Sequence, residues 1–113
     1  MTASPLCRLE DIPNPGGIDL EIKGEACFAV RRGQSVKVFR NSCPHIGAPL
    51  NLIPGQFLDL EKEYIQCSTH GALFEIDSGL CVAGPCRNQS LKAKSCTLIN
   101  GEVYLADDLE RSR

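Results

Sequence analysis

The amino-acid sequence predicts an all-β fold, and three observations support this prediction. Apolar and polar residues alternate strictly from Ile18 to Ile22, which is the period of a half-buried strand. The dipeptide Asn100-Gly101 lies between two short apolar runs and favours a type I′ hairpin turn. No long amphipathic helical pattern occurs anywhere in the chain. A small antiparallel β-sandwich is therefore expected.

The individual strands follow from the same patterns. Turn residues at 23–25 and around Gly33 separate the first strand from two further ones, and the C-terminal hairpin supplies two more. The strands expected are 18–22, 26–30, 36–38, 96–99 and 102–105. Residues 58–65 suit either a short helix or a strand, because Tyr64-Ile65 favours β structure. The polar residues 107–113 are expected to form a frayed turn.

Residues 40–88 differ in composition from the expected strands on either side. This stretch contains four prolines and five glycines and therefore is rich in loops. With 113 residues in all, the chain has the length of one domain. We expect a single domain, 1–113, in which a loop-built subdomain at about 41–88 is attached to one end of the sandwich.

Charge and hydropathy exclude several classes of protein. The 12 basic and 14 acidic residues nearly balance, whereas a nucleic-acid binder needs a basic surface to meet phosphates. No apolar run approaches the roughly 20 residues that span a bilayer. The first residues lack the pattern of a secretion signal. We expect a cytoplasmic protein that binds neither nucleic acid nor membrane.

Cysteine and histidine give the most informative pattern. Seven cysteines are many for this length, and in a reducing compartment they indicate metal ligation, catalysis or small buried side chains. The only two histidines, His45 and His70, each lie within three residues of a cysteine, in Cys43-Pro44-His45 and Cys67-Ser68-Thr69-His70. Each motif offers one thiolate and one imidazole. The set suits tetrahedral zinc or a two-iron cluster in which histidines replace the cysteines of one iron. Mixed motifs favour the two-iron cluster, because zinc fingers place cysteines in one motif and histidines in the other.

Longer segments around these motifs resemble the Rieske [2Fe–2S] family. The resemblance rests on Cys-Pro-His-Ile-Gly-Ala at 43–48, on Cys-Ser-Thr-His-Gly-Ala-Leu-Phe at 67–74, and on Asp-Ser-Gly at 77–79 followed by Gly-Pro at 84–85. It covers about 45 residues. The family's fold is an antiparallel β-sandwich with a small cluster-binding subdomain, in agreement with the strand pattern.

The resemblance implies a ligand set and its surroundings. Cys43 and Cys67 would bind the inner iron of one [2Fe–2S] cluster, and His45 and His70 would bind the outer iron near a partner protein. The same likeness assigns backbone N–H groups that hydrogen-bond to the cluster sulfurs to the loops containing Gly47 and Gly71, and a covering loop to Pro85.

Two departures from the family pattern define the subtype. Twenty-one residues separate His45 from Cys67, so the extra length within 51–66 should form a loop or hairpin that leaves the ligands in place. High-potential members carry an additional cysteine in each motif, where this chain has Ala48 and Thr69. They also carry a serine and a tyrosine, where this chain has Ala72 and Phe74. Fewer hydrogen-bond donors to sulfur predict a reduction potential near the low end of the Rieske range, about −150 mV.

The function that the resemblance implies is electron transport, with no substrate turnover by this chain alone. A monomeric carrier of the ferredoxin type would accept single electrons from a flavoprotein reductase and pass them to a terminal oxygenase. Three alternatives remain at this point: a small subunit of a larger oxygenase or nitrite reductase, a cluster-based redox sensor, and a structural zinc protein. The remaining cysteines have no predicted ligand role: Cys7, Cys27, Cys81, Cys86 and Cys96.

Overall fold

The fold consists of three small antiparallel sheets. The computed structural model describes residues 4–44, 49–51, 55–68 and 71–106, in which loops and turns connect ten strands and one 3₁₀ helix, η1 (Leu9–Asp11). The strands are β1 (Cys7–Arg8), β2 (Gly16–Ile22), β3 (Glu25–Arg32), β4 (Ser35–Arg40), β5 (Tyr64–Gln66), β6 (Leu73–Glu75), β7 (Cys81–Ala83), β8 (Ala93–Lys94), β9 (Cys96–Ile99) and β10 (Glu102–Leu105). No helix within these described ranges has the length and apolar character needed to cross a membrane.

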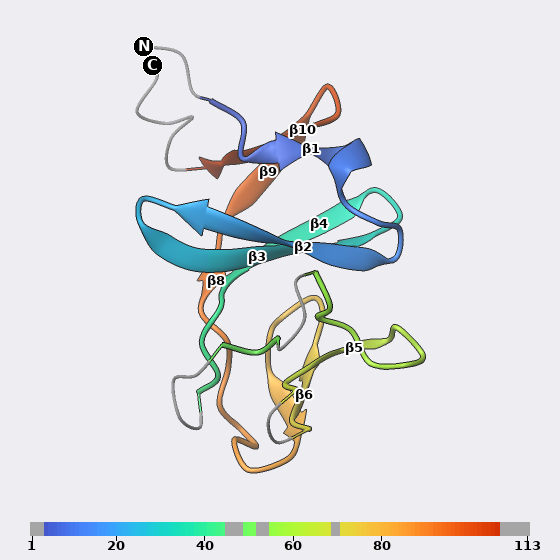
Figure 1. Cartoon of the computed structure of the whole chain (residues 1–113), viewed down its shortest axis with the longest axis vertical. Helices are drawn as coiled ribbons and strands as arrows, with labels where there is room; N and C mark the ends of the chain where they lie inside the picture. Colours follow the sequence, from blue (N-terminus) through green and yellow to red (C-terminus); the bar gives the residue numbers. More distant parts are fainter. Residues whose placement is uncertain (1–3, 45–48, 52–54, 69–70, 107–113) are drawn as a thin grey trace.

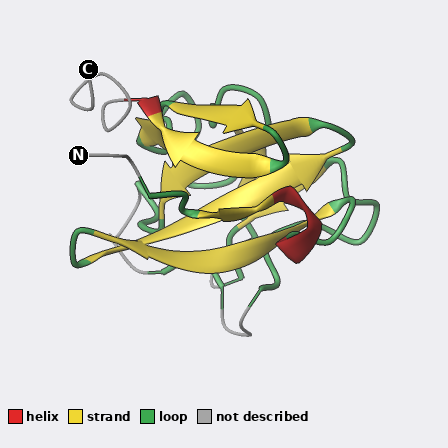
Figure 2. Ribbon diagram, turned by 90° about the horizontal axis from the view of Figure 1, so that it is seen from above, coloured by secondary structure: helices red, strands yellow, loops and turns green. Residues whose placement is uncertain are grey.

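The sheets are stacked along the long axis of the molecule. The sheet β2-β3-β4-β8 lies in the middle, with β1-β10-β9 on one side and β5-β6-β7 on the other (Figure 1). Viewed from above, the strands dominate, and the larger of the red segments, at the edge of the molecule, is η1 (Figure 2). The predicted all-β antiparallel fold is confirmed. The third sheet adds regular structure to a region that the sequence described only as loops.

Tight turns fix the hairpins where the sequence placed them. Lys23 and Gly24 have φ values of 52° and 81°, and Asn100 and Gly101 have 50° and 78°. Two successive positive φ values define the type I′ turn that joins twisted antiparallel strands. Gly33, with φ 65°, opens the β3–β4 turn, in which Arg32 pairs with Ser35. These three turns confirm the predicted strand order on either side of the loop-rich stretch.

The middle sheet is buried on both faces. In β3, four consecutive residues, Cys27 to Val30, are at most 1% exposed. Because side chains alternate across a strand, Phe28 and Val30 contribute to one core, whereas Cys27 and Ala29 contribute to the other. We call the first the site-side core, since it also contains Cys43 and Cys67, and the second the terminal core, since it also contains Val103 and Leu105.

The insertion between the two predicted ligand motifs is a hairpin. Leu58 forms an antiparallel bridge with Ile65, and the Gln66 N–H donates to the Phe57 carbonyl at 2.8 Å. Segment 58–65 therefore contains strand rather than helix, as Tyr64-Ile65 suggested. At its tip Leu60 is fully exposed, while at its base Phe57 is 1% exposed and stacks on Phe28, with ring centroids 4.4 Å apart. Residues 107–113, predicted to be a frayed turn, lie outside the described residues.

Candidate metal centre

The first predicted ligand loop leaves the middle sheet at Arg40 and is closed by Asn41. The Asn41 side chain accepts a hydrogen bond from the Leu50 N–H at 2.7 Å and donates one to Asn51 Oδ1 at 2.9 Å. These bonds join the two ends of the loop that contains Cys43. Sequence reasoning missed Asn41, although an asparagine directly after a strand is a common loop-closing residue.

The second ligand loop begins at Cys67 and returns at Ala72. The Cys67 N–H donates to the Ala72 carbonyl at 2.9 Å, and the Gly71 N–H donates to the Cys67 carbonyl at 2.8 Å. The Ser68 N–H donates to the Leu50 carbonyl at 2.7 Å. That last bond joins the second loop directly to the end of the first one, so the two motifs that the sequence paired are neighbours in space.

A third loop, containing Gly84 and Pro85, lies against the second. Gly84 has φ 103°, and a Cβ atom built on it would lie 2.8 Å from the Ala72 Cα and 3.0 Å from its Cβ. Only a glycine permits this close approach of two backbones. The proline-containing loop therefore packs on the loop that carries Cys67, while its role as a cover of the cluster stays a prediction.

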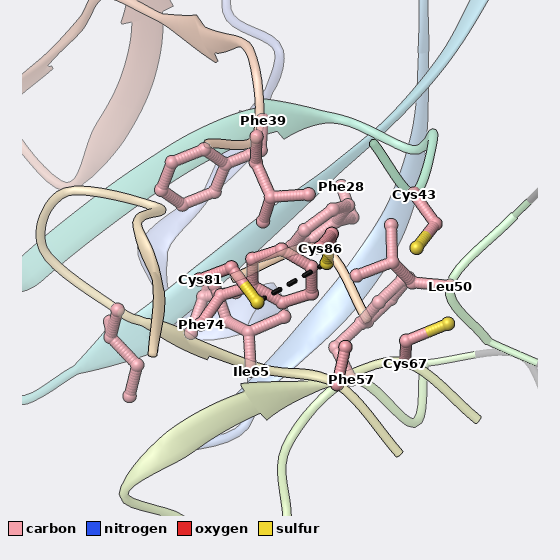
Figure 3. Packing of buried hydrophobic residues seen from close by; sticks show 14 residues of the cluster. Phe28, Phe39, Cys43, Leu50, Phe57, Ile65, Cys67, Phe74, Cys81 and Cys86 are labelled. Atoms are coloured by element: carbon pink, nitrogen blue, oxygen red, sulfur yellow. Dashed lines mark hydrogen bonds between the residues drawn. The ribbon is translucent and has the colours of Figure 1, made fainter. Parts of the chain in front are cut away.

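Two of the four predicted ligands belong to the described part of the chain. Cys43 and Cys67 are both 0% exposed and neither forms a disulfide. Figure 3 shows their side chains at the same end of the site-side core, on separate loops, with Leu50 drawn between them. His45 and His70 lie outside the described residues, as do Gly47, Ala48 and Thr69, so their predicted roles are not tested by the fold.

Residues 2–103 match the family described as the Rieske [2Fe-2S] domain. The chain belongs to this family. That membership excludes the zinc alternative and gives the protein one Rieske-type [2Fe–2S] cluster.

Similar proteins differ widely in length. The Cholesterol 7-desaturase of Caenorhabditis elegans is 27% identical over 88% of this chain, which spans only 24% of that enzyme. Among solved structures, the ferredoxin of carbazole 1,9a-dioxygenase from Nocardioides aromaticivorans IC177 is 24% identical, with a TM-score of 0.77 over 94% of this chain and 98% of that one. A chain from the complex of reduced oxygenase and oxidized ferredoxin in carbazole 1,9a-dioxygenase is 21% identical, with a TM-score of 0.72 over 91% of this chain and all of that one.

The described residues fit a Rieske cluster. Two reduced cysteines, fully buried on adjacent loops, supply the thiolates that the inner iron of such a cluster requires. Their surroundings are apolar, since the site-side core includes Leu50, Ala72 and Phe74. A low-dielectric environment makes each hydrogen bond and each net charge near the cluster count more than it would in water.

Donors that stabilise high-potential Rieske clusters are absent at two described positions. Ala72 and Phe74 are both 0% exposed and have no hydroxyl group to donate. The Gly71 N–H donates to the Cys67 carbonyl, and the positive φ of Gly71, 71°, closes this loop on itself. The hydrogen bonds that the resemblance implies from the loops with Gly47 and Gly71 to the cluster sulfurs stay predictions.

Two further cysteines extend the sulfur-rich region of this Rieske protein. Cys81 and Cys86, on either side of the proline-containing loop, are 1% and 0% exposed, and the Cys86 thiol donates to Cys81 Sγ at 3.2 Å (Figure 3). Cys43 belongs to the same buried core as these two cysteines. Burial, reinforced by these neighbouring sulfurs, raises the pKa of Cys86 to about 12, so this thiol keeps its proton at neutral pH. Cys81 and Cys86 belong to the same site-side core as Cys43 and Cys67, and their proximity to a bound cluster stays a prediction.

Proposed function

We propose that this chain is a one-electron carrier whose cluster is held by Cys43, His45, Cys67 and His70. The observation that carries the proposal is the pair of buried cysteines on two loops joined by the Ser68–Leu50 hydrogen bond, within a chain that matches the Rieske family. A bound Rieske cluster supplies reversible one-electron chemistry at a potential that its histidine ligands raise above that of four-cysteine clusters. We further propose that 41–88 form the cluster-binding part of a single domain.

Protein residues around the site control access and charge. Because Cys43 and Cys67 are fully buried, they would hold the cluster from the interior of the protein, and the resemblance implies that partners would reach it from the side of His45 and His70. The apolar side chains of Ala72 and Phe74 add no donor to stabilise the extra negative charge of the reduced state. This supports a potential in the lower part of the Rieske range, about −150 mV.

We propose a flavoprotein reductase as electron donor and a terminal oxygenase as acceptor for a monomeric, cytoplasmic carrier. This proposal is supported by fold similarity to a ferredoxin of a dioxygenase system over nearly the whole of both chains. The sequence contains two histidines in all. If both bind the cluster, this chain has none for the mononuclear iron of an oxygenase, which is usually held by two histidines and a carboxylate. Electron transfer without substrate turnover by this chain is therefore the function that its residues support best.

A second candidate is a Rieske component of a larger oxidoreductase, since this chain spans 24% of the desaturase that it resembles. Co-purification separates the two proposals. A free carrier elutes from size-exclusion chromatography as a monomer of 12.3 kDa, whereas a subunit elutes with a much larger partner.

The proposed ligands are tested by electron paramagnetic resonance (EPR) of anaerobically purified, dithionite-reduced protein, with iron and acid-labile sulfide assayed on the same sample. We expect a rhombic signal with the low average g value of histidine ligation, together with equal amounts of iron and sulfide. Replacing any proposed ligand, for example Cys67→Ala or His70→Ala, should abolish the signal. As a matched control, Cys96→Ala should retain it, because Cys96 belongs to the terminal core. A full signal in the Cys67→Ala or His70→Ala variant would contradict the ligand assignment.

A further inference from the structure

Two buried thiols contact each other on the proline-containing loop. Cys86 Sγ lies 3.2 Å from Cys81 Sγ, and the Cys81 thiol donates to the Ala83 carbonyl at 3.2 Å. Figure 3 shows this contact between the two sulfur atoms. The side chains of Cys81 and Cys86 are 1% and 0% exposed. Neither cysteine belongs to the proposed ligand set, so the proposed function gives this pair no role.

Backbone hydrogen bonds from one short segment hold both cysteines in place. The Cys81 N–H donates to the Gln89 carbonyl at 2.8 Å, and the Cys81 carbonyl accepts from the Asn88 N–H at 3.3 Å. The Cys86 carbonyl accepts from the Gln89 N–H at 2.9 Å. Because the same two residues bind the backbones of both cysteines, the fold itself keeps the two thiols close together.

The position of the two sulfur atoms suits a covalent bond between them. A disulfide has an S–S length of about 2.03–2.05 Å, so the sulfurs, now 3.2 Å apart, would approach by about 1.2 Å. Small rotations of the two side chains supply a movement of this size. Burial favours the bonded state, because a disulfide is apolar and has no hydrogen that needs an acceptor, whereas each thiol has one.

We propose that Cys81 and Cys86 are a modification site, at which a low-molecular-weight disulfide links them reversibly by thiol–disulfide exchange. The thiolate of one cysteine attacks a sulfur of the small disulfide, whose S–S bond breaks and releases one small thiol. The thiolate of the other cysteine then attacks the mixed disulfide and releases the second small thiol. The two protein protons end on these thiols, and two electrons pass from the protein sulfurs to the small disulfide.

The new bond would fasten the proline-containing loop. Gly84 and Pro85 lie between the two cysteines, and Gly84 packs against Ala72 in the loop that carries Cys67. Because both thiols are buried, an oxidant reaches them only when this loop opens locally. The disulfide then restricts the conformations of the open loop and so favours the closed one. In a reducing compartment such a bond is transient, so the site would respond to oxidising conditions.

The test exposes the full protein to mixtures of reduced and oxidised glutathione. Acid stops the exchange, because the thiolate is the attacking species. Free thiols are then alkylated in denaturant, and trypsin cleaves after Lys62 and Arg87, which places both cysteines and Cys67 in one peptide, 63–87. We expect this peptide to carry a single alkyl group, on Cys67, and an internal link that fragmentation assigns to the other two cysteines. Its mass does not depend on iron, so the test stands even if the proposed function fails.

Cys27 provides the matched control. It is 1% exposed, like Cys81, but belongs to the terminal core, and it should remain open to alkylation under the same conditions. Oxidation of Cys27 to the same extent would indicate unspecific chemistry and would overturn the proposal. Three alkyl groups on peptide 63–87 at every glutathione ratio would overturn it as well. So would a link that includes Cys67, or glutathione attached to the peptide without an internal link.

Fastening of the loop is measured separately from formation of the bond. Oxidation should slow hydrogen exchange of the Gln89 amide, which donates to the Cys86 carbonyl, and should raise Tm by about 5–15 °C. The double variant Cys81→Ser/Cys86→Ser retains side chains of similar size and should show neither change after the same treatment. Equal exchange rates and equal Tm values in the reduced and oxidised protein would overturn the effect on the loop.

Discussion

Gly84 offers a sharp test of how the proline-containing loop retains the cluster. In Gly84→Ala, the new Cβ would lie 2.8 Å from the Ala72 Cα, a distance that real Cβ atoms do not tolerate, and the backbone would keep φ 103°. The unfavourable φ costs about 1–3 kcal/mol. Forced displacement of the packed backbone adds about 1–3 kcal/mol. We therefore expect a loss of roughly 2–6 kcal/mol, and the loop should separate from the one that carries Cys67.

Gly24→Ala provides the matched control. Gly24 also has a positive φ, 81°, but an added Cβ would have nothing within 4 Å. Its loss should be confined to the φ contribution, about 1–3 kcal/mol. The assay follows the visible absorbance of the cluster and the far-ultraviolet circular dichroism during thermal unfolding. For a domain of about 100 residues, each kcal/mol lowers Tm by about 4–8 °C. Gly84→Ala should also release iron to a chelator faster. Equal Tm values and equal iron release in the two variants would refute the loop contact.

Three further outcomes are expected. Phe57→Ala should lower the free energy of unfolding in urea by about 3–5 kcal/mol, because it removes a buried ring at the base of the inserted hairpin. Leu60→Ala at the exposed tip should change it by less than about 0.5 kcal/mol, and similar losses in the two variants would contradict the buried base of the hairpin. Asp19→Ala should lower the free energy of unfolding by about 1–3 kcal/mol, since the Asp19 carboxylate accepts hydrogen bonds from the Gly55 N–H at 2.7 Å and from the Asn51 amide at 3.0 Å. The same variant should reduce the protection of the Gly55 amide from hydrogen exchange, and unchanged protection would argue against the Asp19–Gly55 bond. Lys94 Nζ lies 3.0 Å from Glu25 Oε1 and lowers the pKa of that carboxyl through this close contact, so the pair should stabilise the fold above the ordinary glutamate pKa of 4.5 and lose this effect as pH falls through the lowered pKa. Lys94→Met should therefore weaken the dependence of Tm on pH in this range, and an unaltered pH profile would contradict the expectation.

Much of the fold could be predicted because local rules decide it. The Lys23-Gly24 and Asn100-Gly101 turns require residues that adopt a positive φ, and strict alternation identifies the strand that begins near Ile18. Strands β6 and β7 could not be predicted in this way. Each has three residues, which is too short for a period to emerge, and each gains its hydrogen bonds from partners that the folded chain brings together.

The candidate site, like the fold, could be predicted only in part. Cysteine and histidine in each of two motifs indicated that the loops with Cys43 and Cys67 meet, and the Ser68–Leu50 hydrogen bond shows that they do. Cys43 and Cys86 share one buried core although more than 40 residues separate them in the sequence, so no local pattern predicts that they come together. The sequence alone also did not show that the Gly71 N–H closes its own loop by donating to the Cys67 carbonyl, because a glycine with positive φ occurs in many kinds of turn.

The segment that carries the site leaves the middle sheet and returns to it at neighbouring strands, and this affects how the site can be exchanged between proteins. Residues 41–91 leave from the end of β4 and return at β8, which are paired neighbours, with Phe39 opposite Ala93 and the Arg40 N–H donating to the Lys92 carbonyl at 2.8 Å. A segment whose two ends meet can be inserted into another protein with little distortion of the host. The site is thus suited to insertion into larger enzymes, in which residues of the surrounding protein would pack against it.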